Sequence, residues 1–335
     1  MINACIVGVG AVGPIHARCA ATSKNGCVYA ICDIIPERAD KIAKLYKAKT
    51  YYDFDQMLTD ENIDVVHICT PHYLHKDMAV KALKAGKNII LEKPAAMTLE
   101  ELSELEEAYK ASDKKACIML QNRTNNSVAQ MKNLIDNDGT LGKMLGIAGF
   151  MTWHRDENYY KTEDWRGKWE TEGGGLLINQ AIHMIDLLDW LGGGIEEIKC
   201  SLSNFVNDAI AVEDTAHMTM KFKNGTTGVF YATNGFSTDA PFRIEIIFEN
   251  GTLRYADSRL YRIDTEVEVV TTDSQNAKGK KCWGSGHKGV IEKFYYALEN
   301  NLEDYLDLTE GVHSSKLMLS MYKESVEKGK EWIKI

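Results

Sequence analysis

Long apolar runs, blocks of basic residues and paired cysteine motifs are missing from this 335-residue sequence. No apolar stretch approaches the length that a membrane-spanning helix needs. The first residues enter a strand-like segment without the charged region and cleavage site of a secretory signal, so we expect a cytoplasmic protein. A net charge of −9, from 39 basic and 48 acidic residues, argues against nucleic-acid binding.

Cysteine and histidine usage also excludes some classes of site. No two of the eight cysteines form a Cys-x-x-Cys pair, and several lie within apolar segments, so we expect buried free thiols in a reducing compartment. The histidines lack the spacing to carboxylates or cysteines that metal sites use, so no metal is predicted. The length is sufficient for two domains, each with its own core. The cysteines are at positions 5, 19, 27, 32, 69, 117, 200 and 282.

Apolar runs and helix-compatible segments alternate through the first 120 residues. Strands that alternate with helices at this spacing predict an α/β domain with a parallel sheet and right-handed crossovers. Thr98 and Glu101 form a capping box for the last of these helices. The expected strands are 4–9, 28–32, 65–69, 89–91 and 116–120, and the expected helices are 15–21, 37–47, 75–85 and 99–111.

The sequence Gly8-Val9-Gly10-Ala11-Val12-Gly13 follows the first expected strand and opens the first helix. Gly8 permits a tight turn, Gly10 lets the backbone approach a pyrophosphate, and Gly13 allows close packing of helix on strand. The N-terminus of the helix offers N–H groups to a phosphate. The pattern predicts a dinucleotide site, with a purely structural glycine turn as the alternative.

An acidic residue, Asp33, lies 20 residues beyond Gly13 at the end of the second expected strand. Its carboxylate would accept hydrogen bonds from the adenosine ribose hydroxyls and would repel a 2′-phosphate. Ile34 and Ile35 follow it, where an arginine or serine would favour NADP. The sequence therefore predicts NAD as the cofactor, with NADP less favoured.

The fourth expected strand ends in Glu92-Lys93-Pro94. A residue before proline favours extended backbone, so Lys93 should stay outside any following helix. Ligands of doubly wound sheets bind beyond the carboxyl ends of the strands, where this lysine would lie. Its amine could hydrogen-bond a substrate hydroxyl and, with a lowered pKa, accept the proton. A surface lysine after a core strand is the alternative.

After residue 121 the pattern changes to successive strand-like segments. A loop rich in aromatic and charged residues is expected at 154–172, and Gly173-Gly174-Gly175 introduces an apolar helix over 176–191. Asn224-Gly225 and Asn250-Gly251 indicate hairpins. The pattern predicts a mostly antiparallel sheet with helices on one face. The expected strands are 143–153, 198–206, 215–222, 227–233, 243–248, 252–255, 261–263 and 266–271, and the closing helices are 284–300 and 308–328.

Over essentially its whole length the chain resembles the Gfo/Idh/MocA oxidoreductase family. The resemblance implies a Rossmann domain, residues 1–121, and an α+β substrate domain, residues 122–335, whose large open sheet forms a homodimer or homotetramer. It also implies a nicotinamide cofactor and a sugar or cyclitol whose secondary hydroxyl is oxidised or whose ketone is reduced. The motifs that carry the resemblance are Gly8-x-Gly10-x-x-Gly13, Asp33, Cys69-Thr70-Pro71-His72, Glu92-Lys93-Pro94, Gly173-Gly174-Gly175 with Asn179 and His183, and Gly286-His287 with Phe294.

In this resemblance Lys93 matches the family's catalytic lysine, and His183 matches its catalytic or substrate-orienting histidine. The family often has an aspartate four residues before that histidine, where this chain has Asn179. Asn179 and His183 would share one helix face, but an amide cannot stabilise an imidazolium as a carboxylate would. The departure raises the share of acid–base work expected of Lys93, or of His183 alone. A buried core histidine is the alternative for His183.

Further candidates follow from the chemistry of a sugar site. Rings that pack on apolar C–H faces and donors that bond hydroxyls suit such a pocket, so Tyr160, Trp165 and Arg166 are expected to face substrate. Aromatic packing at a domain interface is an equal alternative. Arg123 and His287 are further substrate candidates, with a structural salt bridge as the alternative for Arg123. The expected cofactor contacts are Gly8, Gly10, Ala11, Val12, Gly13, Asp33, Thr70, Pro71, His72, His75, Glu92 and Lys93.

The combined pattern predicts hydride transfer between NAD and a secondary carbinol, with Lys93 and His183 as the acid–base pair. Partial burial and a positive nicotinamide ring would lower the pKa of Lys93. Two alternatives stay open. One is a redox-neutral enzyme that cleaves or epimerises a glycoside on a retained NAD, and the other is a non-catalytic sugar or dinucleotide sensor. The presence of both Lys93 and His183 argues against the sensor.

Overall fold

The computed structural model describes residues 1–273, 286–327 and 333–334. The chain forms two compact units, of which the first contains residues 1–121 and 287–315 and the second contains residues 122–286 and 316–335. The sequence-based division also falls after residue 121, but it assigned 287–315 to the second domain. Cys282 lies outside the described residues. So do the start of the predicted helix 284–300 and the end of the predicted helix 308–328.

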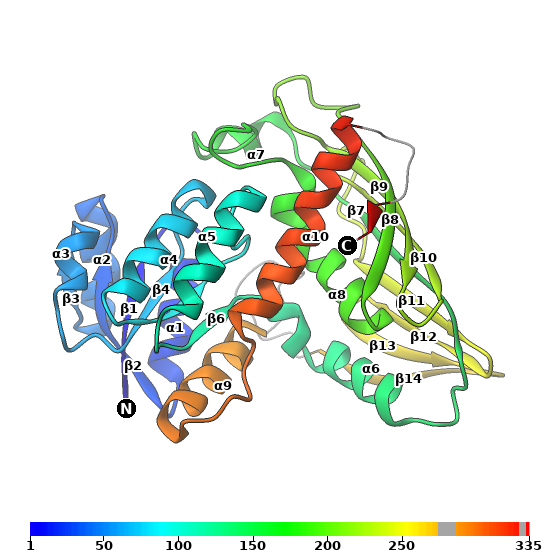
Figure 1. The fold of residues 1–335 in the computed structure, drawn as a ribbon, viewed down its shortest axis with the longest axis horizontal. Coiled ribbons are helices and arrows are strands. Elements are labelled where there is room, and N and C mark those ends of the chain that lie inside the picture. The colour runs from blue at the N-terminus through cyan, green and yellow to red at the C-terminus, as the bar shows by residue number, and fades with distance from the viewer. Residues whose placement is uncertain (274–285, 328–332, 335) are drawn as a thin grey trace. The chain divides into compact units, whose positions relative to one another are not determined.

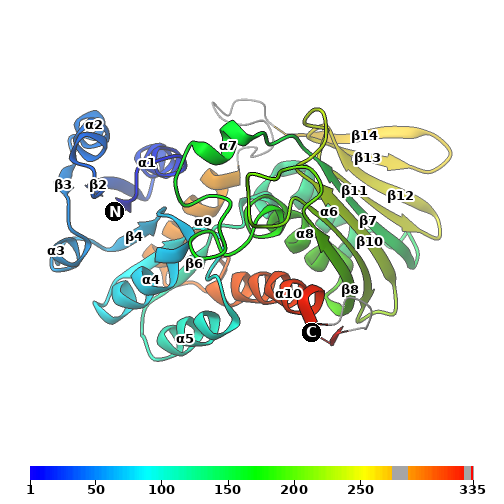
Figure 2. The same cartoon turned by 90° about the horizontal axis from the view of Figure 1, so that it is seen from above.

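The first unit contains a six-stranded parallel sheet in the order β3-β2-β1-β4-β5-β6. Helices cover both faces, with α1 and α2 on one and α4 and α5 on the other (Figures 1 and 2). This is the doubly wound order, in which ligands bind at the carboxyl ends of β1 and β4, where the direction of winding reverses. The strands are β1 Ile2–Val7, β2 Gly26–Cys32, β3 Lys49–Tyr51, β4 Val65–Ile68, β5 Asn88–Leu91 and β6 Ala116–Ile118.

Helices α2 and α5 begin where the sequence indicates a helix start. Pro36 occupies the first turn of α2, and the Thr98 hydroxyl accepts the Glu101 N–H at 3.1 Å at the start of α5. Strand β3 and helix α3 were not predicted, because segments of three and five residues carry too little apolar periodicity. The helices are α1 Gly13–Thr22, α2 Pro36–Tyr46, α3 Phe54–Leu58, α4 His75–Lys84 and α5 Leu99–Lys110.

Helix α9 (Gly286–Asn300) completes the core of the first unit. Phe294 and Tyr295 are fully buried in one cluster with apolar side chains of β1, β2 and α1. Gly26 of β2 leaves no room for a side chain there, since a Cβ atom would lie 2.3 Å from Tyr295 Cε2. This packing is the physical reason that 287–315 groups with residues 1–121, contrary to the sequence-based division.

The second unit contains a nine-stranded sheet in the order β14-β13-β12-β11-β7-β10-β9-β8-β15. Strand β10 pairs with β7 in parallel, and the other described pairings are antiparallel. The expected hairpin glycines, Gly225 and Gly251, have positive φ. The strands are β7 Met144–Thr152, β8 Ile195–Ser203, β9 Thr215–Phe222, β10 Thr227–Thr233, β11 Arg243–Phe248, β12 Gly251–Ala256, β13 Arg259–Ile263, β14 Val267–Thr272 and β15 Ile333–Lys334.

Helices α6 (Asn126–Asn137) and α8 (Ile182–Gly192) cover one face of this sheet, together with the second half of α10 (Leu308–Glu327), as Figure 2 shows. Gly149 of β7 lies directly under α8, because a Cβ atom there would meet Leu188 Cδ1 at 2.8 Å. The single helix expected over 176–191 is instead a π-helical turn, η3 (Leu177–Ala181), followed by α8. The loop expected at 154–172 contains the short helix α7 (Glu157–Lys161).

None of the helices in the described part of the chain combines the length and the apolar character that crossing a bilayer requires.

Candidate cofactor and substrate site

The glycine-rich turn joins β1 to α1 at the carboxyl edge of the parallel sheet. Gly8 has φ +81°, and a Cβ atom on it would lie 2.9 Å from the Cys69 carbonyl oxygen, which follows β4. A Cβ atom on Gly13 would lie 2.1 Å from the Gly8 carbonyl oxygen. Gly10 is different, because its nearest neighbour would be Arg38 Nη1 at 3.9 Å. Two glycines are thus required by packing, and the third leaves an open backbone surface that fits a pyrophosphate.

The carboxylate of Asp33 is fixed beside this turn. Its Oδ2 accepts the Val9 N–H and its Oδ1 accepts the Ile35 N–H, each at 2.9 Å. Arg38, which the sequence analysis missed, brings a guanidinium group to the same place. The signal was available, since Arg38 lies in the first turn of α2, five residues after Asp33. The turn therefore combines backbone N–H groups, an anion suited to ribose hydroxyls and a cation suited to phosphate.

His75 holds together the loops that follow β4 and β5. Its Nδ1 lies 2.7 Å from the Pro94 carbonyl oxygen and its Nε2 lies 2.8 Å from that of Thr70. Burial lowers the pKa of His75, and a neutral ring can donate to only one of the two carbonyls at a time. His72 is also buried, with its ring 5.7 Å from that of His75. His75 thus positions the segment that carries Lys93.

Lys93 follows β5 and is half-buried. Burial is the main reason that the pKa values of His75 and His287 are lowered, and the charge of Lys93 adds to both shifts. The same charge helps to lower the pKa of Glu92. The amine therefore lies close to three polar side chains of the first unit.

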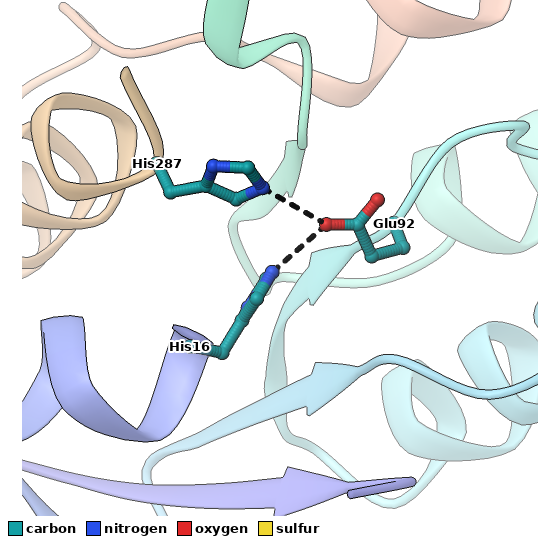
Figure 3. A group of neighbouring side chains, drawn as sticks. All are labelled: His16, Glu92 and His287. Carbon is teal, nitrogen blue, oxygen red and sulfur yellow. Dashed lines mark hydrogen bonds and ion pairs between the residues drawn. The ribbon is translucent and has the colours of Figure 1, made fainter. Parts of the chain in front are cut away.

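Glu92 lies between two histidines from distant parts of the chain, His16 of α1 and His287 of α9 (Figure 3). Its Oε1 is 2.9 Å from His16 Nε2 and 3.8 Å from His287 Nε2. Burial alone would raise the pKa of Glu92, but the His16 hydrogen bond and the neighbouring charges outweigh it and lower the value to about 2. Burial lowers the pKa of His287 to about 4, so its contact with Glu92 is polar rather than ionic.

The ligand atoms of His16, Glu92 and His287 all lie within 4.8 Å of one another, a separation that a metal ion could bridge. The sequence analysis saw no such group, because the three residues come from separate elements with no motif spacing. The ring of His287 faces Glu92 (Figure 3), and its expected contact with substrate stays a prediction.

Asn179 and His183 belong to the second unit, at η3 and α8. The amide Nδ2 of Asn179 donates to Glu172 Oε1 at 2.5 Å, and the Glu172 carboxyl is 1% exposed. This bond fixes the orientation of the amide. His183 is buried at 9% exposure. Glu172 was missed because it reads as one more charged residue of a polar loop.

Tyr159 is the polar centre of the aromatic loop, a role that the sequence analysis did not assign. Its hydroxyl oxygen accepts from Arg166 Nη1 at 2.6 Å and from Gln180 Nε2 at 3.0 Å. The Arg166 guanidinium lies 4.7 Å from the centre of the Tyr159 ring and 4.6 Å from that of Trp165. Arg166 and Trp165 thus form a stacked group with Tyr159.

Two other residues that the sequence offered as substrate contacts, Tyr160 and Arg123, have packing or ion-pair partners within the protein. Tyr160 packs against Ile210 in a small core cluster, which favours the packing alternative for this ring. Arg123 donates to both carboxylate oxygens of Asp186, from Nε at 3.0 Å and from Nη2 at 2.7 Å. Both groups are buried, so the salt bridge that was the alternative for Arg123 is present.

The chain is similar to known proteins in sequence and in fold. The chain is 26% identical to the myo-inositol 2-dehydrogenase of Thermotoga maritima over 309 residues, which cover 90% of this chain and 84% of that protein. It is 33% identical to the inositol 2-dehydrogenase of Salmonella typhimurium over 194 residues, 57% of this chain and 54% of that protein. The solved WlbA dehydrogenase of Bordetella pertussis, in complex with NADH and UDP-GlcNAcA, matches with a TM-score of 0.87 at 25% identity. This alignment covers 100% of this chain and 98% of that one.

Family descriptions match both halves of the chain. Residues 2–120 match the oxidoreductase family with an NAD-binding Rossmann fold, in agreement with the six-stranded sheet and its glycine turn. Residues 128–254 match the GFO/IDH/MocA C-terminal domain, which covers the central strands of the nine-stranded sheet. The chain belongs to the Gfo/Idh/MocA family of NAD-binding oxidoreductases.

Proposed function

We propose that this protein is an NAD-dependent dehydrogenase that oxidises a secondary hydroxyl of a sugar, sugar derivative or cyclitol, or reduces the corresponding ketone. Bound NAD would accept the hydride. The observation that carries the proposal is the glycine turn, in which Gly10 keeps an open face beside Arg38 while Gly8 and Gly13 are required by packing. The relatives named as inositol dehydrogenases support the substrate class.

The cofactor contacts that we propose surround this turn. Residues 8–13 would receive the pyrophosphate, and Asp33 would accept hydrogen bonds from the ribose hydroxyls. An anion at Asp33 opposes a 2′-phosphate, which supports NAD over NADP. Thr70, Pro71 and His72 would line the nicotinamide half. His75 would keep the loop after β4 in register with Pro94 through its contacts with both loops.

Lys93 is the proposed acid–base group. It follows β5 at the edge of the sheet where ligands of this fold bind, and it needs to lose its proton before it can accept one from a carbinol. His183 and Asn179 would orient the hydroxyls of the substrate. The amide of Asn179 would hydrogen-bond a hydroxyl of the substrate, and Trp165 and Arg166 would supply a ring and a donor for the substrate.

We also propose that the protein is a cytoplasmic homo-oligomer. Cys5, Cys32 and Cys117 are buried free thiols, which suit a reducing compartment. The face of the nine-stranded sheet opposite α8 exposes Val229 and Tyr231, and a second copy of the chain would cover these apolar side chains.

Purified protein mixed with NAD and a panel of inositols, sugars and glycosides tests the proposal through the absorbance of reduced nicotinamide. We expect turnover with a subset of the panel, and a loss of about a hundredfold or more in kcat in Lys93→Ala with NAD binding retained. His183→Ala and the double variant would measure the coupling between the two residues.

Other outcomes would select another function. Turnover of a glycoside without added cofactor, by protein that releases NAD on denaturation, would favour the redox-neutral enzyme. Substrate binding with no turnover, and with Lys93→Ala indistinguishable from the parent, would favour the sensor. Failure to bind NAD at all would contradict the assignment of the glycine turn.

A further inference from the structure

Four polar side chains from four elements form a buried chain of hydrogen bonds that leads to Glu92. Tyr295 Oη of α9 lies 2.7 Å from His67 Nε2 of β4. His67 Nδ1 lies 3.0 Å from His16 Nδ1 of α1, and His16 Nε2 lies 2.9 Å from Glu92 Oε1. Tyr295, His67 and His16 are fully buried, and Glu92 is 5% exposed.

The direction of every bond in this chain follows from its carboxylate end. A carboxylate only accepts, so His16 Nε2 carries a hydrogen, and a neutral His16 then accepts at Nδ1. His67 must therefore donate from Nδ1, which leaves its Nε2 to accept the Tyr295 O–H. All three hydrogen bonds point toward Glu92, and both rings are satisfied without a charge.

The protonation states of Tyr295 and His67 agree with this direction. Burial raises the pKa of Tyr295 well above its usual range, so the hydroxyl keeps its proton. Burial lowers the pKa of His67 well below its usual range, which keeps that ring neutral. A doubly protonated His16 would instead donate to His67 from Nδ1 and form a buried ion pair with Glu92, which is the arrangement that the proposed chain excludes.

We propose that His16 is a positioning residue for Glu92, and that the one-way chain from Tyr295 through His67 holds the Glu92 carboxylate charged and fixed beside Lys93. The role of Lys93 in this inference rests on the proposed function, whereas the chain itself does not. A buried anion next to the amine stabilises the ammonium form. The chain would thus set the pH at which Lys93 can accept a proton.

The groups that face Glu92 come from several elements. They are His16 of α1, His287 of α9, His75 of α4, Cys69 after β4 and Lys93 beside it. With the rings and the thiol neutral, Glu92 is the anion of this set and Lys93 is the cation. Replacing the carboxylate by an amide would therefore act chiefly on Lys93.

A metal ion at His16, Glu92 and His287 is the competing occupant of this cluster. It would need the lone pair of His16 Nε2, so the hydrogen on His16 would move to Nδ1 and the bonds to His67 and Tyr295 would reverse. The two arrangements exclude each other. The hydrogen positions on the rings therefore decide between them.

The ring nitrogen signals of ¹⁵N-histidine-labelled full-length protein test the chain without any substrate. The nine histidines are assigned by single substitutions. Near neutral pH we expect a hydrogen on Nδ1 alone in His67 and on Nε2 alone in His16. A hydrogen on Nε2 of His67, or two on His16, would overturn the proposal. Stoichiometric zinc uptake that is lost in His287→Ala would also overturn it.

Variants of the chain test the effect on Lys93 through the pH profile of kcat/KM. His16→Gln keeps an N–H donor for the carboxylate, whereas His16→Leu removes it and Glu92→Gln removes the charge. We expect the acid limb to move to lower pH by about one unit in His16→Leu and Glu92→Gln, and to stay near the parent value in His16→Gln. If His16→Leu does not fold, the other two variants still decide.

Two results separate this inference from the proposed function. Equal profiles for the parent, His16→Gln and Glu92→Gln would show that the chain does not act on Lys93. Protein with the expected ring hydrogens but without NAD binding or turnover would keep the chain and contradict the dehydrogenase. NAD affinity, measured by nicotinamide fluorescence, is therefore recorded for each variant.

Discussion

The amide of Asn179 is held by Glu172, and this fixes what the residue can offer to a ligand. Its Nδ2 donates to the buried carboxyl at 2.5 Å, which fixes the orientation of the amide. Glu172 also accepts the Gly167 N–H, so its carboxyl links the backbone of the 154–172 loop to the Asn179 amide. An aspartate at position 179 would place two carboxylates in contact, and like charges at that distance cannot both ionise readily.

We therefore expect Asn179→Asp alone to lower kcat/KM, and Asn179→Asp with Glu172→Gln to recover much of the loss. The double variant keeps one carboxylate and one amide in exchanged positions. A double-mutant cycle should give a coupling of about 1–3 kcal/mol, measured from kcat/KM across pH. A double variant no more active than Asn179→Asp would contradict the pairing.

At the scale of elements, the glycine turn offers a matched pair of substitutions. Gly13→Ala forces a Cβ atom against backbone, 2.1 Å from the Gly8 carbonyl oxygen, so we expect a loss of about 1–3 kcal/mol in the free energy of unfolding. Gly10→Ala meets only Arg38 at 3.9 Å, so the fold should remain while NAD affinity falls roughly tenfold. Thermal unfolding and NAD titration separate the two effects. If Gly10→Ala bound NAD as tightly as the parent, the proposed pyrophosphate contact at Gly10 would be contradicted.

The buried carboxyl of Glu213 holds the turn before η3 by accepting three hydrogen bonds. Its Oε2 accepts the Gly175 N–H at 3.0 Å, and its Oε1 accepts the Leu177 N–H and the Tyr322 hydroxyl, each at 2.8 Å. Burial nevertheless outweighs these bonds and raises the pKa of Glu213 to about 7. The folded protein therefore favours the protonated carboxyl.

This shift gives a stability prediction with a defined sign. Glu213 has an ordinary pKa of about 4.3 in the unfolded chain, so between about pH 4.3 and pH 7 the folded state binds the proton more tightly. The free energy of unfolding should fall by up to about 3 kcal/mol as the pH rises through this window. Glu213→Gln should remove that slope, as measured by urea unfolding at several pH values. The same slope in parent and variant would contradict the shift.

The sequence predicts those elements whose stability is local. The predicted strands of both sheets follow from apolar alternation and hairpin glycines, and their ends differ from the observed ends by at most three residues. Helix α6 was missed because it begins at Asn126-Ser127, which reads as a turn. Glu172 and Tyr159 were missed because no regular helix or strand spacing relates them to Asn179 and Gln180. Arg123 shows the converse, since sequence chemistry offered it to a ligand and its Nε and Nη2 donate to Asp186 instead.

At the scale of the whole molecule, the proposed homo-oligomer would form through the exposed face of the nine-stranded sheet. Val229 and Tyr231 of β10 and Ile247 of β11 are between 38% and 48% exposed on it. We expect Val229→Glu combined with Tyr231→Glu to lower the mass found by light scattering. Leu45→Glu, at an exposed apolar residue of α2, is the matched control and should leave the mass unchanged. Equal masses for the parent and the β10 variant would contradict this interface.

The return of α9 to the first unit has a consequence for synthesis on the ribosome. Residues 1–121 emerge first from the ribosome. The Tyr295 ring that packs against Gly26 is translated later, after nearly the whole second unit. N-terminal segments usually fold as they leave the ribosome. Here the nascent sheet must wait with an apolar face uncovered, so we expect this segment to bind chaperones until translation passes α9. A chain cut after residue 286 would keep that face open permanently.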